Sequence, residues 1–364
     1  MSGSARIRST ATALPAGGEG RAEWENGWPA ENVAATIATT GIERVRVAPA
    51  GRSLVDYAAT ASRRALALAG CPMEAVDAVL VVTQTPDDRL PPTACRLQEV
   101  LGLRRDIPCL DLHHGCTGYV YGLEHARLLV AGGAAGTVLL CTGDLLTRLL
   151  GEEDHTVRMV FGDGVAATVI VAGEEGEAEG RGGGGPWLSP ARFGTEGSRA
   201  DELCCGSGPG DRLRMDGLGV MSATLRRVPE LVAELQAEAG AGGIDRYFFH
   251  QANAHMLDCL RRKLQLGEGS VPVFLRDTGN LGSASIPLAM ARARAVQGPL
   301  GGRSALVGYG VGFSWAGLLC DLSGLEAAVV EVEVEEEGRG GPGAGTGAGA
   351  GSGGAGRRPR GERG

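Results

Sequence analysis

Cys116 is the residue of this chain whose surroundings are best suited to chemistry. It lies between Gly115 and the pair Thr117-Gly118, where an apolar, strand-like run ends and a helical pattern begins. The N–H groups and positive dipole end of a helix favour thiolate over thiol, so we expect a lowered cysteine pKa. The glycines allow a sharp turn and close approach of a substrate. A nucleophile is one interpretation, and a buried structural cysteine is the other.

Two further motifs carry polar side chains that could act beside that sulfur. His250 follows the aromatic pair Phe248-Phe249, so it stands where a buried strand ends, the place where ligands bind in α/β sheets. The alternative is a core histidine with its hydrogen bonds satisfied. Asn280 lies in a run of small residues over 277–287; its amide donates hydrogen bonds but cannot act as a base. The alternative there is a turn or helix cap.

The fourth motif is a glycine-spaced turn over residues 308–315, Gly-Tyr-Gly-Val-Gly-Phe-Ser-Trp. No long helical pattern follows it, which argues against a dinucleotide-binding loop. A turn that directs a backbone N–H toward an oxyanion fits the pattern better.

Strands that alternate with helices must position these motifs. Apolar runs over 76–83 and 137–142 predict buried strands, and amphipathic patterns predict helices over 53–69, 94–101, 117–131, 223–239 and 254–264. The two strand runs resemble runs near 245–249 and 306–307, at nearly the same displacement along the chain. The sequence therefore predicts two similar α/β halves packed together.

Composition restricts the possible partners of the protein and the compartment expected for it. A net charge of −8 with no long basic block argues against nucleic acid as a partner. The nine cysteines are scattered without metal-ligand spacing, so we expect no metal and reduced thiols in a cytoplasmic protein. No apolar run is long enough to span a membrane.

Three segments are predicted: an N-terminal half over 1–172, a C-terminal half over 173–326, and a tail over 327–364. Gly- and Glu-rich stretches mark linkers at 173–185 and 206–210. Residues 329–335 alternate apolar and acidic side chains, which fits an edge strand or a solvated acidic run; we favour the solvated run. The Gly-rich stretch 338–364 has almost nothing to bury, so we expect disorder.

Taken together, the four motifs resemble the β-ketoacyl-ACP synthase III family, in order, from about residue 5 to 324. The resemblance implies the thiolase fold, with two βαβαβ-type halves in a five-layered α-β-α-β-α arrangement, and a homodimer. It also implies acyl carrier protein as partner and no cofactor beyond the acyl-ACP or acyl-CoA thioester substrates.

The resemblance assigns roles to the residues of the motifs. Cys116 would take the acyl group, while His250 and Asn280 would hold the thioester carbonyl of a malonyl unit and stabilise the enolate formed as CO₂ leaves. The backbone N–H groups of Cys116 and Val311 would form the oxyanion hole, although the family has glycine at 311. The positions expected to contact substrate or pantetheine are Asn253, Leu90, Leu218, Gly310 and Gly312.

Several positions depart from the family pattern. Ala35, Thr39 and His155 replace a tryptophan and two arginines that grip coenzyme A, so we expect an acyl-ACP donor. Leu218 replaces an asparagine, and Leu90 replaces a phenylalanine that closes the acyl pocket across the dimer. These changes favour a divergent enzyme of specialised metabolite or lipid biosynthesis.

Two rival functions remain. The first is acyl transfer from Cys116 to an alcohol or amine without decarboxylation, although acyl transfer has less need for Asn280. The second is a catalytically silent partner subunit, which the presence of Cys116 disfavours. A non-decarboxylating thiolase would need a second cysteine in the final turn, and none is there.

Overall fold

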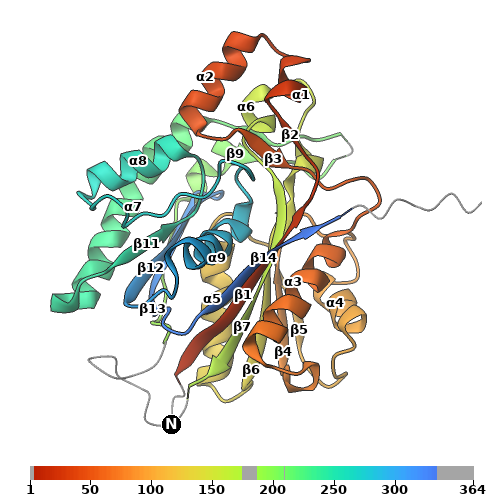
Figure 1. Ribbon diagram of the computed structural model, residues 1–364, viewed down its shortest axis with the longest axis vertical. Helices are drawn as coiled ribbons and strands as arrows, with labels where there is room; N and C mark the ends of the chain where they lie inside the picture. The colour runs from red at the N-terminus through yellow and green to blue at the C-terminus, as the bar shows by residue number, and fades with distance from the viewer. Residues whose placement is uncertain (1–3, 174–186, 209, 334–364) are drawn as a thin grey trace, which may run out of the picture. The chain divides into compact units, whose positions relative to one another are not determined.

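The computed structural model describes residues 4–173, 187–208 and 210–333, and two β-sheets organise them (Figure 1). The larger sheet has six strands in the order β14-β1-β7-β6-β4-β5. β7 runs antiparallel to both of its neighbours, and the other neighbouring strands pair in parallel. These strands are β14 (Glu326–Val332), β1 (Ala5–Pro15), β7 (Asp163–Ala172), β6 (Thr137–Leu145), β4 (Ala78–Val82) and β5 (Cys109–Leu112).

The smaller sheet repeats the arrangement of the first. Its order is β11-β12-β13-β8, with one parallel pair followed by two antiparallel pairs, as in β4-β6-β7-β1. Asp77 and Asp245 occupy equivalent places: the N–H of Asp77 donates to the Thr137 carbonyl, and that of Asp245 to the Arg303 carbonyl. The strands are β11 (Arg246–Phe249), β12 (Arg303–Gly310), β13 (Ser314–Asp321) and β8 (Arg192–Thr195). The predicted repeat of two α/β halves is confirmed.

Three layers of helices enclose the two sheets (Figure 1). Apolar clusters place α3 and α4 on the outer face of the larger sheet, α5 and α9 between the sheets, and α7 and α8 against the smaller sheet. The layer sequence is therefore α-β-α-β-α, as predicted. The helices are α3 (Leu54–Ala69), α4 (Thr93–Leu101), α5 (Gly118–Ala131), α9 (Ser285–Gln297), α7 (Gly217–Ala239) and α8 (Ala254–Lys263).

Local sequence signals explain where these helices begin. The Ser53 hydroxyl accepts from the Asp56 N–H, and the Asp56 carboxylate accepts from the Ser53 N–H, a capping box that starts α3. α7 begins six residues earlier than predicted because the Asp216 carboxylate caps the N–H groups of Leu218 and Gly219. The sequence pattern showed the apolar face of this helix but not its polar first turn.

Shorter elements complete the described chain. They are β2 (Gly18–Gly20), α1 (Arg21–Glu25), α2 (Ala30–Thr40), β3 (Arg44–Arg46), α6 (His155–Arg158), β9 (Leu203–Cys204), β10 (Arg214–Met215) and the 3₁₀ turns Met73–Ala75, Leu146–Leu149, Gly197–Glu202, Gly240–Gly242 and Gly282–Ala284. None of the helices in the described ranges is both long and apolar enough to cross a bilayer.

The prediction of a solvated acidic run over residues 329–335 was wrong for residues 329–332, which belong to β14. β14 is the edge strand of the larger sheet, and it pairs in parallel with β1 from Ser9 to Pro15. Glu331 forms an ion pair at 2.8 Å with Arg46, whose side chain is 6% exposed. The alternating pattern therefore belongs to an edge strand, in which the acidic Glu331 is neutralised by an ion pair with Arg46. Residues 174–185 of the linker predicted at 173–185, and the tail at 338–364, lie outside the described residues, and the boundary at 172/173 stays a prediction.

Candidate active site

Cys116 lies in the turn between β5, which ends at Leu112, and α5, which begins at Gly118. It is buried, with 7% of its surface exposed, beneath the turn that joins β12 to β13. A Cβ atom on Gly310, whose φ is +147°, would lie 2.8 Å from both Cβ and Sγ of Cys116. Glycine at 310 is therefore what lets the second half of the molecule close over the sulfur.

The electrostatics of Cys116 differ from the expectation. Burial, with a smaller effect of the nearby Asp144 carboxyl, raises the pKa of the thiol to about 11. Hydrogen bonding to the backbone of Val311, and to that of Cys116 itself, lowers the pKa by less. The expected lowering by the helix terminus is thus outweighed by desolvation, which the isolated motif did not reveal.

His250 follows the last residue of β11 and is 2% exposed. Its Nδ1 lies 2.8 Å from the Ser285 hydroxyl oxygen, which also accepts the Gln251 N–H at 3.2 Å. Burial lowers the pKa of His250 to about 4, so its imidazole is neutral at neutral pH. With the Ser285 O–H donated to Nδ1, the ring proton resides on Nε2, which makes that nitrogen a donor.

Asn280 lies in the loop before α9 and is 4% exposed. Its Oδ1 accepts the Gly282 N–H at 2.9 Å, while its backbone exchanges hydrogen bonds with Val160 and Gly162. Because Oδ1 is occupied by a backbone donor, the amide orientation leaves Nδ2–H as the group available to a ligand. Asn280 is thus a fixed neutral donor.

Gly282 connects the three motifs. Its N–H donates to Asn280 Oδ1, and its backbone also interacts with the His250 ring. It lines the same pocket as Cys116 and Val311. That pocket has a volume of about 730 Å³. The structure therefore brings the two neutral donors and the thiol to one region, at the junction of the two halves.

The sequence did not single out the apolar wall of this pocket. Leu146, Leu149, Phe161, Leu203 and Leu213 line it. They come from four separate segments, so no local pattern in the sequence joins them. An apolar wall beside a buried thiol suits an acyl chain.

The vicinal pair Cys204-Cys205 also lines the pocket. All nine cysteines of the chain are free thiols. Among the residues that the structure describes, no group of three or more His, Cys, Asp or Glu side chains is arranged to hold a metal ion.

Asp144 is a second buried group that sequence reasoning missed. It lies in β6 and lines the pocket; its Oδ1 accepts from the Gln84 N–H at 2.6 Å and from both Thr83 and Thr85. Burial raises the pKa of its carboxyl, and Oδ2 has no hydrogen-bond partner within the described ranges. Asp144 and His250 share one sequence signal, because each is a polar residue near the end of a buried strand.

A polar network supports the turn that carries the nucleophile. The Thr117 hydroxyl lies 2.9 Å from His114 Nδ1 and 3.0 Å from the Ser314 hydroxyl. Ser314 in turn donates to the Val311 carbonyl at 2.8 Å. These contacts tie the residue after Cys116 to the loop that carries Val311.

None of the five predicted substrate-contacting residues is in the lining of this pocket, and neither is His250 or Asn280, which reach it through Gly282. Leu90 and Leu218 are 83% and 82% exposed, respectively, at the surface of the described chain. Asn253 caps α8 through a 2.8 Å hydrogen bond from the Met256 N–H. Gly312 lies in the turn after Val311 with φ of +126°. Their roles toward substrate stay predictions.

Comparisons with known sequences agree with this arrangement. Residues 110–181 match the family described as 3-oxoacyl-[acyl-carrier-protein (ACP)] synthase III, and residues 236–322 match its C-terminal family. The chain is 30% identical over 292 residues to a β-ketoacyl-[acyl-carrier-protein] synthase III of Neisseria meningitidis, covering 78% of this chain and 88% of that protein.

Solved structures share the architecture. A 3-oxoacyl-(acyl-carrier protein) synthase from Burkholderia xenovorans superposes with a TM-score of 0.83 at 29% identity, covering 91% of this chain and 98% of that one. The priming β-ketosynthase of the R1128 polyketide pathway gives a TM-score of 0.79 at 26% identity, covering 88% and 97%. The predicted thiolase fold is confirmed.

Proposed function

Because the chain belongs to the β-ketoacyl-[acyl-carrier-protein] synthase III family, whose members are acyl-transferring condensing enzymes, we propose that Cys116 carries the acyl group in a decarboxylative condensation. The observation that carries the proposal is that two neutral donors, His250 and Asn280, both contact the backbone of Gly282, which lines the pocket of the buried thiol. Neutral donors suit an enolate, whose negative charge develops only during the reaction.

In the loading step, the Cys116 sulfur attacks the carbonyl carbon of an acyl thioester, and the carrier thiol leaves with the proton that Cys116 loses. The carbonyl oxygen becomes an oxyanion that the N–H groups of Cys116 and Val311 stabilise. The hydrogen bond of Val311 to the thiol supports this role, because a donor at the sulfur also lies close to a carbon bonded to it. The acyl chain extends along the apolar wall.

In the condensation step, a malonyl thioester places its carbonyl oxygen between His250 Nε2–H and Asn280 Nδ2–H. Loss of CO₂ leaves an enolate, which the two donors stabilise without giving up a proton. Its carbon attacks the acyl carbonyl on Cys116, and the sulfur leaves as thiolate. His250 with a pKa of about 4 remains a donor and not a base throughout the neutral range.

The acyl donor is an acyl-carrier-protein thioester rather than acyl-coenzyme A in this proposal. Ala35, Thr39 and His155 stand where the family grips coenzyme A, and the surface around His155 is acidic, with Glu152 and Glu153 beside it. Carboxylates repel the phosphates of the nucleotide. The similarity to a priming ketosynthase of a polyketide pathway supports a role in specialised metabolism or lipid biosynthesis.

The proposal includes a cytoplasmic homodimer. β5 is an edge strand of the larger sheet, and it carries Leu110 with 48% of its surface exposed. Leu90 is 83% exposed, which supports burial against a second copy. Light scattering of the purified chain tests the dimer, and a monomer at micromolar concentration would contradict it.

A product assay tests condensation against the rival of acyl transfer to an alcohol or amine. Enzyme loaded from acyl-ACP is mixed with malonyl-ACP, and both CO₂ and the β-ketoacyl-ACP product are quantified. We expect one CO₂ for each product, and Asn280→Ala to load normally while producing neither. Acyl transfer to an added alcohol or amine, with no CO₂ from malonyl-ACP, would establish the rival function instead.

A further inference from the structure

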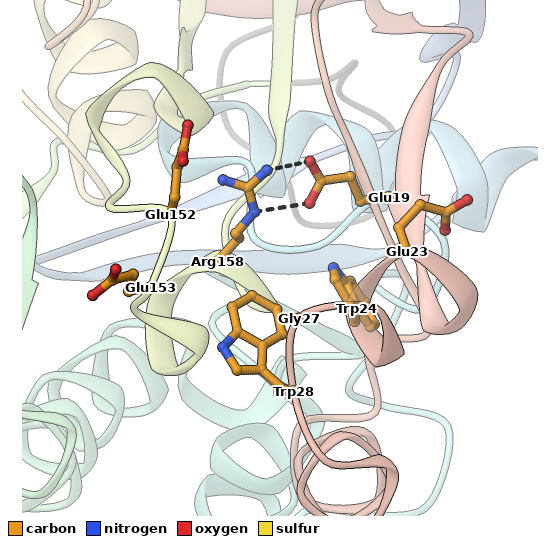
Figure 2. Close-up of a pocket in the computed structure, with 8 residues that line it drawn as sticks. All are labelled: Glu19, Glu23, Trp24, Gly27, Trp28, Glu152, Glu153 and Arg158. Carbon is orange, nitrogen blue, oxygen red and sulfur yellow. Dashed lines mark hydrogen bonds and ion pairs between the residues drawn. The ribbon is translucent and has the colours of Figure 1, made fainter.

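A second pocket lies away from the catalytic one and has an unusual lining. It is open to solvent, has a volume of about 620 Å³, and shares no lining residue with the pocket of Cys116. Figure 2 shows its side chains, which come from the α1 region and from the loop that ends in α6. They are Glu19, Glu23, Trp24, Gly27, Trp28, Glu152, Glu153 and Arg158.

The charge of this pocket is strongly negative. Its one cation, Arg158, is held by the carboxylate of Glu19 in a two-point ion pair at 2.5 and 3.0 Å. Glu23 accepts the Gly20 N–H, which lowers the pKa of its carboxyl and keeps it ionised. Glu152 and Glu153 are exposed, with no ion pair to another described residue. The charge of Arg44 also stabilises the Glu23 anion, so the carboxylates of Glu152 and Glu153 are the two in this lining without a described cation.

The aromatic walls supply a second, independent observation. Trp24 is 1% exposed, and its indole N–H has no acceptor in the described ranges. Figure 2 places that nitrogen on the ring edge facing the Glu19–Arg158 pair, at the side of the pocket. A buried donor without a partner is costly, so a ligand oxygen that accepts from it would be stabilising.

The second tryptophan of the lining, Trp28, could contact a ligand through the face of its indole ring. Trp28 is half-buried, and its ring lies 5.9 Å from that of His155, tilted by 51°. An indole face next to uncompensated carboxylates attracts organic cations, through the negative face of the ring as well as through charge.

We propose that this pocket binds a hydroxylated organic ammonium ion, an amino alcohol. The ammonium group would lie between Trp28 and the carboxylates of Glu152 and Glu153, and the hydroxyl oxygen would accept from Trp24 Nε1. The same charges exclude phosphorylated nucleotides, because the carboxylates of Glu152 and Glu153 repel phosphate groups. The site is separate from the thiol, so the inference stands whether or not the chain performs condensation.

Titration of the full chain with choline and with ethanolamine tests the site, with tryptophan fluorescence as the readout at constant ionic strength. Wild type should show saturable quenching by both amines. Tetramethylammonium, which lacks the hydroxyl, should bind at least threefold more weakly than choline. The double variant Glu152→Gln/Glu153→Gln should weaken choline binding at least tenfold, and Trp28→Ala should abolish it.

Glu99→Gln is the matched control, since Glu99 is an exposed glutamate of α4 outside this pocket, and it should leave choline affinity unchanged. A linear response to choline, equal to that of sodium chloride, would overturn the proposal. An unchanged affinity in the double variant would also overturn it, and so would tighter binding of adenosine 3′,5′-bisphosphate than of choline. None of these readouts depends on the condensation activity.

Discussion

Nδ1 of His250 and the hydroxyl oxygen of Ser285 lie 2.8 Å apart, joining the end of β11 to the first residue of α9. The same hydroxyl accepts the Gln251 N–H, so its own proton is free to go to the imidazole. With the O–H donated in this direction, the ring proton resides on Nε2, the nitrogen that our mechanism requires as a donor. Ser285 is therefore a positioning residue that acts through His250.

Replacing Ser285 with alanine should slow decarboxylation while leaving acyl loading intact. Loss of one buried hydrogen bond of about 1.5 kcal/mol corresponds to roughly a tenfold fall in the rate of CO₂ release. Ser285→Thr keeps the hydroxyl and should recover most of the rate. An equal loss in loading and decarboxylation would mean that Ser285 supports the fold rather than the histidine. The measurement is single-turnover CO₂ release from malonyl-ACP alongside the mass of the loaded enzyme.

Gly310→Ala should abolish acyl loading and lower the melting temperature. The new methyl group would lie 2.8 Å from Cβ and Sγ of Cys116, and φ of +147° adds backbone strain. Gly301→Ala is the control, because a Cβ atom there meets nothing within 4 Å. Thermal unfolding and acyl-adduct mass spectrometry check both effects. Normal loading by Gly310→Ala would contradict the packing described for the nucleophile.

The pKa of about 11 for Cys116 predicts how its alkylation depends on pH. A raised pKa keeps the thiol protonated at neutral pH, so the reactive thiolate increases about tenfold for each unit of pH below the pKa. The rate of iodoacetamide labelling at this residue, measured by peptide mass spectrometry, should therefore rise steadily between pH 7 and 10. Cys116→Ala identifies background labelling. A rate that is already constant above pH 8 would contradict burial as the dominant effect.

Truncation before β14 should destabilise the protein. A chain that ends at Ser323 loses the parallel pairing of residues 326–332 with β1 and the ion pair of Glu331 with Arg46. We expect its melting temperature to fall by at least about 5 °C, given roughly 2–4 °C for each kcal/mol in a domain of this size. A chain that ends at Glu333 retains the strand and is the control. Equal melting temperatures for the two truncations would show that β14 contributes little.

The sequence was most informative where a single segment carried the signal. Cys116, His250 and Asn280 each stand at the end of a strand or in a glycine-rich turn. In the structure, Gly282 contacts His250 and Asn280 and lines the same pocket as Cys116. The repeat of two halves was also predictable from the sequence. The structure shows it at Asp77 and Asp245, which make equivalent backbone contacts.

Effects that depend on residues distant in sequence were not predictable. The pKa of Cys116 depends on the other half, where Gly310 packs against its side chain and the backbone of Val311 hydrogen-bonds to the thiol. The partner of β14 is β1, at the opposite end of the chain, so an alternating acidic pattern could not distinguish an edge strand from a solvated run. Asp144 was missed because the groups that donate hydrogen bonds to its carboxylate come from the loop after β4, which is distant in the sequence.

The central claim is that Cys116 carries an acyl group that an extender unit then removes. Intact-protein mass spectrometry of wild type and Cys116→Ala tests it, with acyl-ACP and acyl-coenzyme A as donors and malonyl-ACP added second. We expect an adduct on wild type alone, formed more readily from acyl-ACP and lost when malonyl-ACP is added. An adduct that persists with malonyl-ACP would contradict condensation, and no adduct from either donor would contradict the role of Cys116.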